Sequence, residues 1–109
     1  MKNFIVITVL FAATTALAST WNNVVLVDQA CSTRASANPD AHTRGCALQC
    51  AKSGFGILTP DGKFLKFDQH GNDEAAKLLS SASKKDHLRV KVVGDRKGDT
   101  IAVNSVAFE

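Results

Sequence analysis

Five short apolar runs separated by turn-forming residues are the feature that most constrains this fold. The first run, WNNVVLVDQ, is rich in valine and ends in polar residues, which is typical of a buried strand closing at a polar edge. The last two runs alternate apolar and charged residues around a glycine-containing turn, so they predict a hairpin with one solvated face. The runs lie at residues 21–29, 55–59 and 63–68, around Leu88–Val92, and from Thr100 onward.

Turn chemistry separates the middle two runs and joins the last two. Pro60-Asp61-Gly62 suits a β-turn, because proline presets the first central position and glycine accepts a positive φ. Residues 94–98 are expected to form the turn of the last hairpin. Residues 32–41 are small and polar, include Asn38-Pro39-Asp40, and are expected to form a loop.

Two helices are predicted between the strands. The first is expected to begin near His42 or Thr43, with Thr43 as a plausible N-cap, and to stop at Gly54. The second covers residues 72–85, with Asn72 as the N-cap, acidic residues in the first turn and lysines in the last.

The order strand, loop-helix, hairpin, helix, hairpin predicts the fold class. A five-stranded, partly open barrel with a helix between strands three and four is the OB-fold arrangement, mainly β with two helices. Five short strands are few for a β-sandwich, and a ferredoxin-like fold would need a βαββαβ order that the chain does not follow.

The N-terminal 18 residues have the three regions of a secretory signal peptide. A basic start at Lys2 precedes the apolar run at residues 4–13, and the small-residue ending predicts cleavage after Ala18. The apolar core is too short for stable membrane anchoring, and no other long apolar run follows. We therefore expect a periplasmic or secreted protein, without a membrane span after cleavage, whose residues 19–109 form a single OB-like domain.

Charge and aromatic content argue against a nucleic-acid partner. The formal net charge is +3, of which Lys2 of the signal peptide supplies one, and basic residues alternate with acidic ones along most of the chain. Phe55, Phe64 and Phe67 lie on the predicted strands that OB-folds use for ligands, but core packing explains most of them. Trp21 is expected to be a core or rim aromatic. The ligand or protein partner stays open.

The stretch Cys31–Gly54 holds all three cysteines and one of the three histidines. If the helix begins early enough, His42, Cys46 and Cys50 share one face at four-residue spacing, and Cys31 could reach them from the end of the first strand. Three thiolates and an imidazole suit Zn²⁺, and thiolates also suit copper as Cu(I). Asp28 is then a candidate second-shell partner for the imidazole.

A disulfide is the other interpretation of this cluster. Export favours pairing of Cys31 with Cys46 or Cys50, which would staple the loop-helix to the barrel and leave one thiol. The odd thiol could serve a redox or intermolecular role. His70 and His87 are predicted to be surface residues. The sequence contains no complete enzyme pattern, since a cysteine nucleophile at Cys46 or Cys50 with His42 would lack an evident orienting group.

Four stretches resemble a group of small exported bacterial proteins of unknown function, common in Acidobacteria and related phyla. They are W-x-x-x-V-x-V-D-x-x-C, H-x-x-x-C-A-x-x-C-A-K-x-G, D-G-K-x-x-x-F-D and V-x-V-x-G-x-x-x-G-D-T-I-x-V-x-S-V, which span residues 21–31, 42–54, 61–68 and 90–106. This chain departs from the group at Asn22 and Asn23, where glycine is usual, and at Ser32, where it is frequent. The resemblance implies an OB-type barrel and export. Members carry the equivalents of Asp28, Cys31, His42, Cys46, Cys50 and Lys52.

Overall fold

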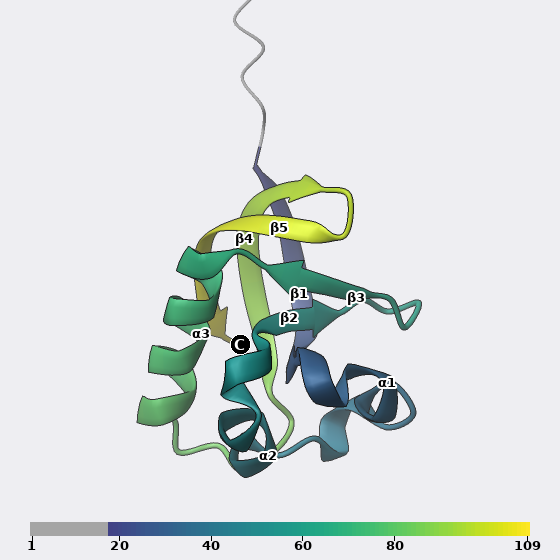
Figure 1. The fold of residues 1–109 in the computed structure, drawn as a ribbon, viewed down its shortest axis with the longest axis vertical. Helices are drawn as coiled ribbons and strands as arrows, with labels where there is room; N and C mark the ends of the chain where they lie inside the picture. Colours follow the sequence, from purple (N-terminus) through teal and green to yellow (C-terminus); the bar gives the residue numbers. More distant parts are fainter. Residues whose placement is uncertain (1–17) are drawn as a thin grey trace, which may run out of the picture.

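The structure is a computed structural model that describes residues 18–109. Its five strands close into a barrel in the order β1-β2-β3-β5-β4 (Figure 1). Neighbouring strands are antiparallel except β3 and β5, which run parallel. The strands are β1 (Ser19–Asp28), β2 (Phe55–Leu58), β3 (Phe64–Phe67), β4 (Arg89–Lys97) and β5 (Thr100–Phe108).

This barrel confirms the predicted OB-like arrangement, but the sheet is closed rather than partly open. Strand β1 closes it, because its first part pairs with β4 and its last part, Val25–Asp28, pairs with β2. The register against β4 shifts between Trp21 and Val24, where Asn23 takes a positive φ of 52°. Such a bulge bends a strand and increases its twist, which lets β1 serve both neighbours.

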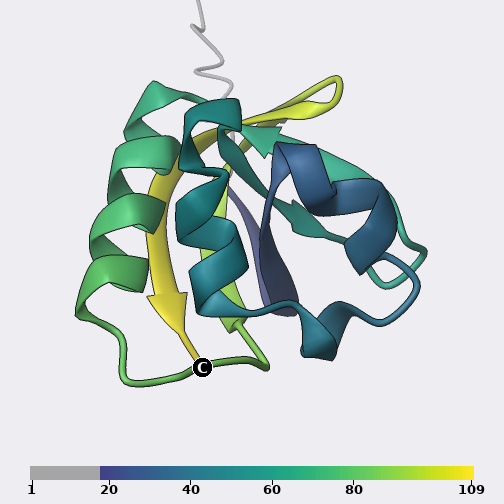
Figure 2. The same ribbon diagram turned by 60° about the horizontal axis from the view of Figure 1, so that its bottom comes forward.

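Helices cover one side and one end of the barrel. The helix α3 (Gln69–Ser81) packs against β5 and β2, and the short helices α1 (Ser32–Ala35) and α2 (Arg44–Gln49) lie between β1 and β2 in sequence. Seen from the covered end, teal α2 lies between green α3 and dark blue α1 (Figure 2). Three single-turn 3₁₀ helices complete this connection, namely η1 (Gln29–Cys31), η2 (Pro39–Ala41) and η3 (Ala51–Ser53).

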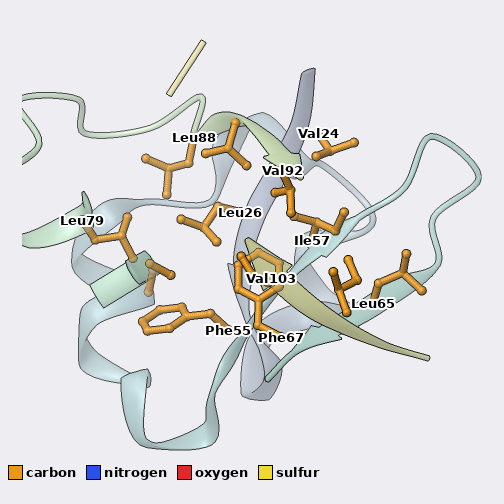
Figure 3. Packing of buried hydrophobic residues seen from close by; sticks show 14 residues of the cluster. Val24, Leu26, Phe55, Ile57, Leu65, Phe67, Leu79, Leu88, Val92 and Val103 are labelled. Atoms are coloured by element: carbon orange, nitrogen blue, oxygen red, sulfur yellow. The ribbon is translucent and has the colours of Figure 1, made fainter. Parts of the chain in front are cut away.

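The apolar run of β1 is buried on both faces, which explains why it does not alternate. Val24 and Leu26 belong to the main core inside the barrel, together with residues from every other strand and from α3 (Figure 3). Val25 and Val27 belong to a smaller cluster on the other face, where Ala35 of α1 packs against them. The connection that follows β1 is therefore held to the outside of the barrel by apolar contacts.

The two main helices differ from their predicted bounds. Thr43 is the N-cap of α2, as predicted, and its Oγ1 accepts a hydrogen bond from the Cys46 N–H at 3.1 Å. The helix itself ends at Gln49, and η3 then leads to Gly54, whose φ of 88° is the expected left-handed stop.

Helix α3 begins at Gln69 rather than after Asn72, so that prediction is wrong. Its N-cap is Asp68, whose carboxylate accepts from the Gly71 N–H at 2.9 Å and from the Val103 N–H of β5 at 3.2 Å. Asn72 lies inside the helix, and its Oδ1 accepts from the Phe55 N–H at 2.8 Å. Asp68 therefore caps the helix and ties it to the sheet at once. The helix ends at Ser81, before the two lysines that were predicted to close it.

The last hairpin is longer and tighter than predicted. Strand β4 runs on to Lys97, and the turn is confined to Gly98 and Asp99 instead of residues 94–98. A register shift between Val93 and Gly94 absorbs the change, and Gly94 pairs with Val103. A Cβ at Gly94 would overlap the Ala102 carbonyl oxygen, so glycine allows the two strands to approach at this bulge.

The predicted signal peptide, residues 1–18, lies outside the described residues except for Ala18, and its cleavage stays a prediction. Among residues 18–109, none of the helices has the length and apolar character to cross a membrane.

Candidate functional site

Asp28 is the buried acid at the end of β1. Its side chain is 0% exposed, and it is hydrogen-bonded through both oxygens. Oδ2 accepts from the backbone N–H of Cys31 at 3.0 Å, and Oδ1 lies 2.8 Å from Nε2 of His42. A buried carboxylate is costly unless such partners satisfy it. Asp28 therefore fixes both the turn that presents Cys31 and the loop that presents His42.

Strand pairing brings Cys31 and Cys50 to the same place although 19 positions separate them. Asp28, the last residue of β1, is the direct partner of Phe55, the first residue of β2. The residues that follow β1 and those that precede β2 therefore leave the sheet side by side. Cys31 ends η1 on one side, and Cys50 is the C-cap of α2 and the N-cap of η3 on the other.

Ser53 joins these two turns. Its Oγ accepts from the Ala30 N–H at 3.1 Å and donates to the Cys50 carbonyl oxygen at 2.8 Å. The hydroxyl thus bridges the backbone beside Cys31 to the backbone of Cys50. This contact fixes the distance between the two turns more firmly than strand pairing alone would.

Three potential metal-ligand atoms meet at this point. One carboxylate oxygen of Asp28 and the sulfur atoms of Cys31 and Cys50 all lie within 4.8 Å of one another. Partial burial, the Asp28 carboxylate and the neighbouring Cys50 thiol together raise the pKa of Cys31 to about 11. Cys31 is therefore a protonated thiol at neutral pH, and any cation that binds here must displace its proton.

His42 and Cys46 are placed differently from the predicted helix face. His42 precedes the N-cap of α2 and has extended backbone (φ −66°, ψ 126°), so it does not share a helical stripe with the cysteines. The physical reason is the Pro39 turn η2, which ends just before His42 and directs its ring back toward Asp28. Cys46 lies in the first turns of α2 and is exposed.

A cavity of about 250 Å³ lies beside the cluster. Cys31, His42 and Cys46 all border it, so three of the four predicted ligand residues line one cavity. Alanines and polar residues of the α1 and η2 segments form the rest of its wall, among them Arg34. Cys31 is the residue that belongs both to this wall and to the group with Asp28 and Cys50.

An ion pair that the sequence did not indicate anchors the loop of the site. Arg89 of β4 binds the Asp40 carboxylate through Nε at 2.8 Å and Nη2 at 3.0 Å, and its Nη1 donates to the Asn23 carbonyl oxygen at 2.8 Å. The guanidinium holds the pKa of Asp40 below its ordinary value. The sequence pattern placed Arg89 on the solvated face of a strand and so gave no sign of this ion pair. The turn Asn38-Pro39-Asp40 was the local sign that the loop is ordered.

The other residues singled out in the sequence are not among the potential ligands of this site. His70 and His87 are exposed, as predicted, and the pKa of His87 is raised by the adjacent Asp86 carboxylate. Trp21 is half-buried against the core. Phe55 and Phe67 are buried in the core.

All three cysteines are free thiols in this structure, so the predicted disulfide staple is not formed. The Ser53 hydroxyl, which bonds the Ala30 N–H and the Cys50 carbonyl oxygen, holds the two turns together instead.

Comparison with protein-family models, with curated proteins and with solved structures finds no significant match. The arrangement of side chains is therefore the basis for a functional interpretation.

Proposed function

We propose that this chain is an exported, OB-like binding module that holds a soft cation, Zn²⁺ or Cu(I), at Asp28, Cys31 and Cys50. The observation that carries the proposal is the approach of one carboxylate oxygen and two sulfur atoms to within 4.8 Å of one another at the end of β1. Two thiolates favour soft or borderline cations, and a carboxylate completes a donor set that zinc accepts.

The surroundings of the cluster support this proposal. His42 contacts Asp28 at 2.8 Å, and the Cys31 N–H contacts the other carboxylate oxygen, so the acid is already oriented by two partners. Outer partners of this kind commonly hold metal ligands in place. The two turns that carry the cysteines are fixed by Ser53, so a cation would not have to order them.

A reversible thiol pair is a second candidate, because the sulfur atoms of Cys31 and Cys50 lie within 4.8 Å of each other. In that function the two thiols lose two protons and two electrons to a disulfide-bearing oxidant and become a disulfide. The raised pKa of Cys31 makes it a poor attacking thiolate, so Cys50 would have to attack.

Thiol counting and zinc binding on the same sample separate the two candidates. The exported protein would be purified without reductant, and its free thiols would be titrated in denaturant. Three thiols together with one tightly held Zn²⁺ equivalent support the cation centre. One thiol and no zinc would instead show that two of the three cysteines are paired in a disulfide, and would remove the metal proposal.

Matched serine variants assign the ligands. Cys50→Ser should weaken Zn²⁺ binding, measured by competition with a chromophoric chelator, by about 10- to 100-fold or more. Cys46→Ser removes a thiol that is not in the Asp28 group and should leave equilibrium binding close to that of the native chain. Equal losses in both variants would contradict the assignment.

A further inference from the structure

The cavity beside Cys31 offers a route by which a cation would reach the proposed site. We infer that the cation arrives through this cavity as a small anionic thiolate complex, with Cys46 and His42 as its first protein ligands. It then passes through Cys31 to the inner group, which is formed by Asp28, Cys31 and Cys50. This inference rests on the proposed function and specifies the form of its ligand.

Cys31 connects the two sets of donors. It belongs to the inner group with Asp28 and Cys50, and it also borders the cavity. Among the residues that the structure describes, the inner group supplies three donors, whereas a closed tetrahedral site needs four. A cation held there keeps one coordination position for an incoming or outgoing ligand, which is the property of an exchangeable site.

His42 has a second nitrogen available for the cavity. Its Nε2 is engaged by Asp28, whereas Nδ1 has no hydrogen-bond partner among residues 18–109. No buried side-chain nitrogen or oxygen in that range is left unsatisfied, so Nδ1 keeps contact with the open space that His42 borders. The residue is only 9% exposed, and the Asp28 carboxylate favours the tautomer with the proton on Nε2. Nδ1 then presents a lone pair.

Cys46 supplies the matching soft donor. Its thiol is exposed and borders the same cavity, within reach of solvent and of a carrier. A thiolate and an imidazole nitrogen are a suitable pair for first capture of Zn²⁺ or Cu(I).

The walls of the cavity favour a carried cation over a bare one. Ala35, Ala37 and Ala41 give a mainly apolar lining, and Arg34 places a positive charge beside it. A guanidinium repels a free cation but attracts an anionic complex and its carboxylates. A volume of about 250 Å³ gives room for a small thiol.

The transfer is a ligand exchange without change of oxidation state. The cation–sulfur bond to the carrier breaks as the bond to Cys46 forms, and the proton of the Cys46 thiol leaves with the carrier thiolate. The same exchange then moves the cation to Cys31 and Cys50, which release two protons: one returns to the Cys46 sulfur and the other passes to solvent.

The test follows capture of Cu(I) from its glutathione complex by stopped-flow measurement of thiolate-to-copper absorbance. Equilibrium affinity is measured separately by competition with a chromophoric Cu(I) chelator. Cys46→Ser should capture Cu(I) about ten-fold more slowly than the native chain, while its equilibrium affinity stays within a few-fold. Gln49→Ser, also exposed on α2 but outside the cavity wall, is the matched control and should capture at the native rate.

Ala37→Phe fills the cavity without removing a donor and should slow capture in the same way. Native rates in both Cys46→Ser and Ala37→Phe would overturn the inference while leaving the inner site intact. Failure of the native chain to bind Cu(I) at equilibrium would remove the proposed function and this inference with it.

Discussion

Replacing Asp28 tests how much its two hydrogen bonds contribute to the free energy of unfolding. Asp28→Ala removes the acceptor of two hydrogen bonds, from the Cys31 N–H and from His42 Nε2. A buried donor left without a partner costs about 1–3 kcal/mol, so the two together should lower the free energy of unfolding by about 3 kcal/mol. With a urea slope of about 1.5 kcal/mol per M, the unfolding midpoint should fall by about 2 M.

The assay is urea unfolding followed by circular dichroism, in reductant and chelator so that no cation adds to the stability of the native chain. Asp28→Asn keeps the shape of the side chain and one acceptor oxygen, and the His42 imidazole can change tautomer. This variant should therefore lose only about 1 kcal/mol of its free energy of unfolding. The control is Asp73→Ala, which removes an exposed carboxylate bonded to Gln69 and should cost about 0.5 kcal/mol or less. An Asp28→Ala midpoint no lower than that of the control would refute the structural role of the Asp28–His42 pair.

Three further perturbations test other parts of the structure. Arg89 lowers the pKa of Asp40 below its ordinary value of 3.8. The stability that Asp40→Asn removes should therefore be present above that ordinary pKa and should be lost as the pH falls through the lowered one. Thermal melts of both proteins at several pH values would follow the difference. Gly71→Ala places a Cβ against Val103 and should cost about 1–3 kcal/mol in urea unfolding, and an unchanged midpoint would mean that α3 can shift freely. Leu26→Ala should cost about 2–5 kcal/mol because Leu26 is fully buried in the main core, and a loss below 1 kcal/mol would contradict the packing described.

Local sequence patterns were sufficient for the five strands and their order, but residues 32–41 were predicted to be a loop and instead contain the helix α1 and the turn η2. The non-alternating apolar run of β1 and the Pro60-Asp61-Gly62 turn both predicted what the structure contains, because burial on both faces and turn chemistry leave direct traces in sequence. Closure of the barrel left no such trace, since it depends on which residues of β1 pair with β4 across the chain.

The missed boundaries have tertiary causes. Asp68 and Asn72 are both good capping residues, and only the contact of Asp68 with the Val103 N–H decides between them. Gly94 looked like part of a turn, but it is a bulge that lets β4 continue.

The candidate site was foreseeable as a set of residues but not as an arrangement. Cys31, His42, Cys46 and Cys50 stood out by type and spacing. The helical stripe was wrong because the separate turn η2, which begins at Pro39, ends just before His42. The contact between Cys31 and Cys50 follows from the pairing of Asp28 with Phe55, a register that spacing does not reveal.

The central claim is that Asp28, Cys31 and Cys50 bind a soft cation. X-ray absorption at the zinc edge of Zn²⁺-loaded Cys46→Ser protein tests it most directly, because this variant retains the proposed ligands and lacks the third thiol. The account predicts two sulfur neighbours at about 2.3 Å together with oxygen or nitrogen neighbours at about 2.0 Å. A zinc shell made only of oxygen and nitrogen, or no zinc retained after desalting, would contradict it.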